Sequence, residues 1–123
     1  MAVEQEINGN PAALAFDRAV DELRRGEKTG HWMWFIFPQI AGLGRSFMSQ
    51  RYAISSLEEA QAYLEHPVLG PRLRECAGIV AQTQGQSAEQ IFGGIDAQKL
   101  RSSMTLFLRA APDELVFKQV LDQ

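Results

Sequence analysis

Apolar residues recur every three or four positions along most of this chain, the spacing typical of amphipathic helices. The first such stretch begins at Asn10-Pro11, a pair suited to the start of a helix, and ends at Gly26. Two more begin at Ser56 and Ser87, where a serine is followed three residues later by Glu or Gln, as in a capping box.

The other predicted helix boundaries rest on proline, aspartate and histidine. Pro71 and Asp96 suit the starts of two further helices, and Pro112 separates the second of these from a last helix at the C-terminus. We expect His66 to cap the end of the helix before it, with a donor or positive charge against the terminal carbonyls.

One segment has no polar residue and therefore no period. From Trp32 to Phe37 every side chain is large and apolar, and Pro38 follows. Burying six such side chains contributes about 10 kcal/mol before conformational entropy is subtracted, so we expect the segment to lie inside the core. Its length fits a buried strand or a short buried helix, and the sequence leaves this choice open.

Length and composition indicate one ordinary domain. The chain has 123 residues, of which 46% are hydrophobic and 22% charged, and this excludes a disordered chain. We therefore expect a mainly α fold, with a loose tail over residues 1–9 and one compact, multihelical domain of five to seven helices over residues 10–123.

Charge and cysteine content exclude several partners. The net charge of −3 comes from intermixed acidic and basic residues, without the positive face that nucleic acid requires. No apolar stretch approaches the ~20 residues of a membrane span, and the N-terminus is no signal peptide. Cys76 is the only cysteine, and with His31 and His66 it makes no zinc set. We expect a cytoplasmic protein with no metal, cofactor, membrane or nucleic acid.

Four motifs, in order along the chain, resemble a known family. They are Lys28 to Gln39 (KTGHWMWFIFPQ) with Gly42-Leu43-Gly44 and Ser46, then Tyr52-Ala53-Ile54 with Ser56-Leu57, His66 to Gly70, and Lys99 to Phe107. Together they resemble the small bacterial proteins catalogued as domain of unknown function 1810. The resemblance implies a small helical domain and no particular reaction.

Two features of that family bear on this chain. Some of its members carry the label calpastatin, but calpastatin segments are repeated and disordered, whereas this chain is compact, so the label carries no weight. Members often continue past the position of Gln123, so we expect any site residue supplied by such a tail to be missing here.

Aromatic, titratable and anion-binding side chains crowd into the segment from Lys28 to Tyr52. His31 is a candidate acid or base, and Trp34 offers an indole for stacking on a flat ring. The candidate ligand-binding residues are Lys28, Trp34, Gln39, Arg45, Ser46 and Tyr52. The plainer alternative is that both tryptophans belong to the core and that His31 marks its boundary with solvent.

Two hypotheses of function follow. The first is a domain that binds or hydrolyses a nucleotide or an ADP-ribose-like small molecule, with His31 as acid or base and Lys28 or Arg45 holding negative charge. The alternative is a non-enzymatic protein-interaction module or homodimer, anchored by Trp34 or Phe47.

Two further patterns are interpreted as structural. Gly42 to Ser46 lacks the spacing of a nucleotide-binding loop and reads as a flexible turn. Ser102 and Ser103, near Lys99, have the spacing of a solvated helix face, which we prefer to a Ser/Lys nucleophile.

Overall fold

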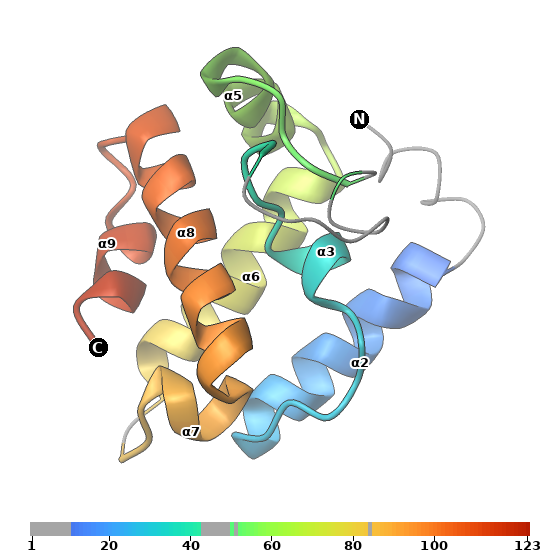
Figure 1. The fold of residues 1–123 in the computed structure, drawn as a ribbon, viewed down its shortest axis with the longest axis vertical. Helices are drawn as coiled ribbons and strands as arrows, with labels where there is room; N and C mark the ends of the chain where they lie inside the picture. The colour runs from blue at the N-terminus through green and yellow to red at the C-terminus, as the bar shows by residue number, and fades with distance from the viewer. Residues whose placement is uncertain (1–10, 43–49, 51, 84) are drawn as a thin grey trace.

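Seven helices make up the part of the chain that the structure describes (Figure 1). The structure is a computed structural model and describes residues 11–42, 50, 52–83 and 85–123. The helices are α2 (Pro11–Arg25), α3 (Met33–Ile36), α5 (Leu57–Glu65), α6 (Leu69–Gln82), α7 (Ala88–Phe92), α8 (Gly94–Ala110) and α9 (Leu115–Leu121). These residues contain no strand and one isolated bridge, between Ile40 and Ile54. The predicted mainly α fold is confirmed, and the predicted tail lies outside the described residues.

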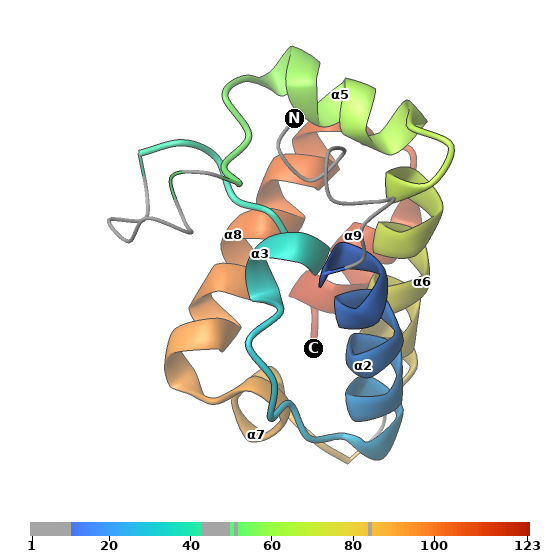
Figure 2. The same ribbon diagram turned by 90° about the vertical axis from the view of Figure 1, so that its right-hand side faces the viewer.

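The helices form a bundle in which α6 contacts α2, α5 and α9. α8 packs against α5, α7 and α9, and the single turn of α3 lies on α2 and α6. In both views α3 is placed between α2 and α8 (Figures 1 and 2). This arrangement brings residues 33–39, from the first half of the chain, next to α8 in the second half.

Aromatic rings fill two parts of the core. In the first, ring centroids lie 6.1 to 6.3 Å apart among Trp32, Phe37 and Phe92. In the second, centroid distances of 5.5 and 5.9 Å join Tyr63, Phe107 and Phe117. Each of these rings is at most 7% exposed, so both groups are well inside the protein.

The apolar run from Trp32 to Phe37 forms a helical turn, and not a strand. Its expected burial holds for four of the six residues, while Trp34 and Phe35 are only partly buried. A helix turns by about 100° per residue, so consecutive side chains cannot all face the same core. Trp34 is therefore partly exposed at the surface.

Most predicted helix ends are confirmed, with small shifts. Gly26 (φ 75°) follows α2, and Ser87 and Gln90 form the predicted capping box of α7. α6 begins two residues before Pro71, which lies in its first turn, where a backbone N–H is not needed. α8 begins at Gly94, so Asp96 lies in its first turn and does not cap it.

His66 caps the end of α5, as predicted, but it does so through its backbone N–H, which donates to the carbonyl oxygen of Tyr63 (3.2 Å). It follows the last residue of α5, but its ring is an acceptor: Nδ1 lies 3.1 Å from the backbone N of Val68 and 3.2 Å from that of Leu69. The imidazole therefore satisfies N–H groups at the start of α6 rather than carbonyls at the end of α5.

No helix in the described part of the chain has the length and apolar character needed to cross a membrane.

Candidate functional site

The loop that connects α2 to α3 is held by one carboxylate, that of Glu22 in α2. Its Oε1 accepts hydrogen bonds from the backbone N–H groups of Thr29 (2.7 Å) and Gly30 (2.8 Å) and from Nε1 of Trp32 (2.9 Å). Burial alone raises the pKa of Glu22, but these hydrogen bonds, from Gly30 and Thr29 first and then Trp32, outweigh it and lower the pKa to about 2. The carboxylate is therefore ionised and fixes the path of the loop.

Glycine at position 30 allows the loop to approach this carboxylate closely. A Cβ there would lie 2.9 Å from Cδ1 of Trp32 and 3.1 Å from Oε2 of Glu22. Both distances are shorter than ordinary carbon contacts. The Gly-His-Trp part of the motif is thus shaped by packing around Glu22.

Lys28 joins the same loop to the first turn of α8. Its Nζ lies 2.8 Å from Oδ2 of Asp96, 2.6 Å from the carbonyl oxygen of Gly30 and 5.0 Å from the ring centroid of Trp32. The side chain of Lys28 is only 7% exposed. Its ammonium is thus already bound within the protein.

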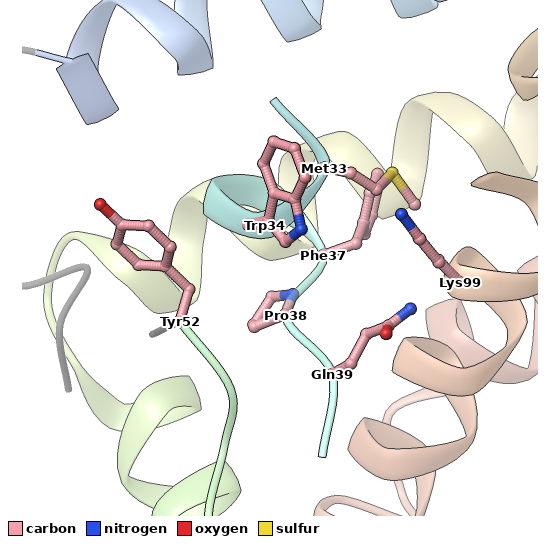
Figure 3. A pocket seen from close by; sticks show the side chains of 7 residues that line it. All are labelled: Met33, Trp34, Phe37, Pro38, Gln39, Tyr52 and Lys99. Atoms are coloured by element: carbon pink, nitrogen blue, oxygen red, sulfur yellow. The ribbon is translucent and has the colours of Figure 1, made fainter. Parts of the chain in front are cut away.

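A small hollow at the surface of α3 brings together several predicted site residues (Figure 3). Its lining residues are Met33, Trp34, Phe37, Pro38, Gln39, Tyr52 and Lys99, and we call it the Trp34 hollow. Its volume of about 10 Å³ is enough for about one water molecule. Figure 3 shows Lys99 reaching from α8 toward Trp34, with Gln39 below both.

Charge at the Trp34 hollow comes from two lysines that share one aspartate. Nζ of Lys99 lies 5.6 Å from the ring centroid of Trp34 and 3.6 Å from Oδ1 of Asp96, whose other oxygen binds Lys28. Two ammonium groups and one carboxylate leave a net positive charge beside an indole. Lys99 is the more exposed lysine, with 31% of its side chain accessible.

The predicted site residues fall into three groups in the structure. Trp34, Gln39 and Tyr52 line the Trp34 hollow together. Lys28 and the exposed His31 do not line it. Arg45, Ser46 and the alternative anchor Phe47 lie outside the described residues.

Sequence reasoning missed the role of Lys99 in this hollow. Lys99 is 65 positions from Trp34 in the sequence, and no local pattern connects the two residues. The available signal was indirect, since both belong to motifs of the same family.

Ser103 and Cys76 are poorly placed to act as nucleophiles. Ser103, expected on a solvated face, is fully buried, and its Oγ has no hydrogen-bond partner. Burial, and then the nearby charge of Glu75, raise the pKa of Cys76 to about 12, so its thiol stays protonated. Among the described residues no three His, Cys, Asp or Glu side chains gather as a metal site.

These features define a small multihelical domain built around the segment from Lys28 to Gln39. The chain belongs to the family described as Protein of unknown function (DUF1810), whose profile matches residues 6–123. The motif resemblance is thereby confirmed. The chain is also similar to a solved structure, the conserved hypothetical protein Rv1873 from Mycobacterium tuberculosis. The two share 58% sequence identity, with 89% of this chain and 79% of that chain covered and a TM-score of 0.87. None of the curated proteins matches this chain.

Proposed function

We propose that this domain binds a planar, anionic small molecule of the nucleotide or ADP-ribose class at the Trp34 hollow. The observation that carries the proposal is the position of the Lys99 ammonium, 5.6 Å from the ring centroid of a partly buried tryptophan. An indole surface suits an aromatic base, and an ammonium beside it suits a phosphate.

The size of the hollow decides how such a ligand would bind. A volume of about 10 Å³ cannot enclose a base, so the ring would lie on the accessible part of Trp34. Gln39 lines the same hollow and offers an amide for hydrogen bonds to the ring edge. Lys99 would hold the phosphate, since Lys28 is nearly buried and tied to Asp96.

Binding is better supported than hydrolysis. The predicted acid or base, His31, is exposed and does not line the hollow. The predicted charge holder Lys28 already binds Asp96 and Gly30. A hydrolytic site needs a proton donor or acceptor within hydrogen-bond reach of the reacting bond, and the described residues that line the hollow include no carboxylate or imidazole.

Tryptophan fluorescence provides a direct test. Trp32 is 2% exposed, so a ligand that stacks on Trp34 should change the emission of Trp34 alone. We expect AMP, ADP-ribose or NAD to quench it saturably, and adenosine and ribose 5-phosphate to bind more weakly because each lacks one half of the interaction. Lys99→Gln should weaken binding roughly threefold to tenfold.

Lys118→Gln is the matched control. Lys118 belongs to α9, its side chain is 62% exposed, and it also pairs with an aspartate, Asp122. This variant should bind like the unmodified protein. Failure of every nucleotide to quench emission would overturn the proposal. So would unchanged binding by both Lys99→Gln and Trp34→Ala when it is measured by titration calorimetry, which Trp34→Ala requires because it lacks the fluorescent reporter.

A second candidate, the interaction module, draws support from exposed apolar side chains. Ile95 is 75% and Leu115 is 68% exposed, and a contact with another protein would remove this apolar surface from water. Light scattering tests this candidate: a homodimer that Ile95→Glu converts to a monomer would support it, and a monomer at every concentration would remove the homodimer.

A further inference from the structure

A larger groove lies on the outer face of α8, separate from the Trp34 hollow. It has a volume of about 440 Å³ and runs between α8, the first residue of α5 and Ile40. The groove and the hollow share no lining residue: Gln39 lines the hollow, and the next residue, Ile40, lines the groove. We call it the α8 groove.

The charged residues of the α8 groove are all positive. Of the residues that the structure describes, Arg101 and Arg109 line it and no acidic residue does, although the chain as a whole has a net charge of −3. Arg101 forms an ion pair with Glu89, which lies outside the groove. Arg109 forms no ion pair with any carboxylate of the described residues.

Another cavity shows what a neutralised arginine looks like in this protein. The cavity beside α5 and α9 is lined by Arg74 and Glu114, whose Nε and Oε1 atoms lie 2.7 Å apart. A second hydrogen bond of 2.9 Å completes that pair. Among the described residues Arg109 has no such partner, so its guanidinium can bind an anion from solution.

The position of Arg109 at the end of α8 explains only in part why an arginine lies beside this groove. A cation in the last turn of a helix interacts favourably with the helix dipole, which accounts for an arginine there. It does not account for the apolar surface beside it. That surface comes from Ile40, Leu106 and Leu57, and Leu57 is 40% exposed.

Hydroxyl groups lie between the two arginines. Arg101 and Arg109 are eight residues apart, roughly 12 Å along the helix. Thr105, halfway between them, donates its hydroxyl hydrogen to the carbonyl oxygen of Arg101 (2.8 Å). Its lone pairs, and the hydroxyl of Ser102, give the groove further polar groups.

We infer that the α8 groove binds a small amphiphilic anion, with its carboxylate or phosphate at Arg109 and its apolar body on Ile40, Leu57 and Leu106. The volume lies in the range of small-ligand pockets, and an apolar lining with few polar groups is their usual composition. This site is independent of the ligand proposed for the Trp34 hollow.

The test compares four probes below their micelle-forming concentrations: octanoate, octyl phosphate, the uncharged octyl glucoside, and inorganic phosphate. Binding is measured by titration calorimetry and by methyl chemical shifts of Ile40, Leu57 and Leu106. We expect saturable binding of octanoate or octyl phosphate, with shifts at these methyl groups. The glucoside and inorganic phosphate should each bind at least fivefold more weakly, because each lacks either the charge or the apolar body. The stronger of the two anions identifies the head group.

Variants separate the groove from the rest of the surface. Arg109→Gln should weaken octanoate or octyl phosphate binding about fivefold, Arg109→Lys should restore part of it, and Leu57→Ser should weaken it as well. Arg18→Gln, an exposed arginine on α2, is the control and should bind normally. Trp34→Ala should also bind octanoate normally, whatever its effect on nucleotides.

Three results would overturn the inference. The first is absence of binding by both octyl anions. The second is octyl glucoside binding as tightly as they do, which would make the groove a general apolar patch. The third is unchanged binding by Arg109→Gln, or shifts confined to methyl groups outside the groove.

Discussion

Removing the charge of Glu22 should destabilise the protein in a pH-dependent way. Glu22→Gln keeps the size of the side chain but replaces an ionised acceptor of three hydrogen bonds by a neutral one. The lowering of the Glu22 pKa from 4.5 to about 2 corresponds to about 3 kcal/mol of stability. A neutral amide oxygen recovers part of this, so we expect a net loss of about 2 kcal/mol at pH 7.

The direction of the pH dependence follows from the pKa values of the two states. The pKa of Glu22 is lower in the folded than in the unfolded protein, so its carboxylate stabilises the fold fully above about pH 4.5. This contribution is lost as the pH falls from there toward 2. The stability difference between the unmodified protein and Glu22→Gln should therefore shrink over that interval.

Urea unfolding at pH 7, 5, 4 and 3 measures this difference. Glu27→Gln is the control, because Glu27 belongs to the same loop and is exposed. The reasoning is refuted if the two variants have the same free energy of unfolding at pH 7. It is also refuted if the gap between Glu22→Gln and the unmodified protein stays constant down to pH 3.

Three further predictions concern packing and capping. Gly70→Ala should cost about 2 kcal/mol or more, because its Cβ would overlap the carbonyl oxygen of Leu64. Gly78→Ala, in the same helix with no atom near its Cβ, should stabilise by about 0.5–1 kcal/mol. Ser103→Ala should raise stability by about 1 kcal/mol, since it removes a buried hydroxyl without a partner. His66→Ala should lower stability by about 1 kcal/mol, because two N–H groups at the start of α6 lose their acceptor.

Thermal and urea unfolding measure all of these changes. Equal effects of the two glycine substitutions would show that α5 and α6 are not in close contact at Gly70. A loss of stability in Ser103→Ala would mean that the hydroxyl does have a partner. An unchanged melting temperature for His66→Ala would remove the capping role of the imidazole.

The sequence predicted the helices well because each depends mainly on its own residues. Gly26 ends α2, and the Ser87 and Gln90 side chains cap α7, as local spacing indicated. His66 was predicted correctly as the cap at the end of α5, but its ring accepts hydrogen bonds from the next helix instead of donating to the carbonyls of α5. The next helix, α6, starts three residues later, so its first N–H groups lie within hydrogen-bond distance of the ring.

The composition of the Trp34 hollow could be predicted only in part. Trp34 and Gln39 are five residues apart, so their proximity follows from the sequence, whereas Tyr52 is brought beside them where the chain returns at the bridge between Ile40 and Ile54. Lys99 comes from α8, and its contact with Trp34 depends on how α3 and α8 are placed in the bundle. Periodicity predicts a helix and its buried face, but it does not identify which other segment of the chain that helix contacts.

Asp96 links the buried loop to the exposed site. The sequence predicted a helix cap. In the structure each of the two carboxylate oxygens of Asp96 lies near a different lysine, and the two lysines have different roles. Lys28 binds at 2.8 Å, is nearly buried and holds the loop in place, whereas Lys99 lies at 3.6 Å and is 31% exposed. If Asp96 had only Lys99 beside it, their charges would cancel and the hollow would have no net attraction for an anion. Because Lys28 also binds Asp96, part of the charge of Lys99 remains available at Trp34. The most unusual motif of the chain therefore contributes to the proposed site mainly through Lys28, a residue that does not line it.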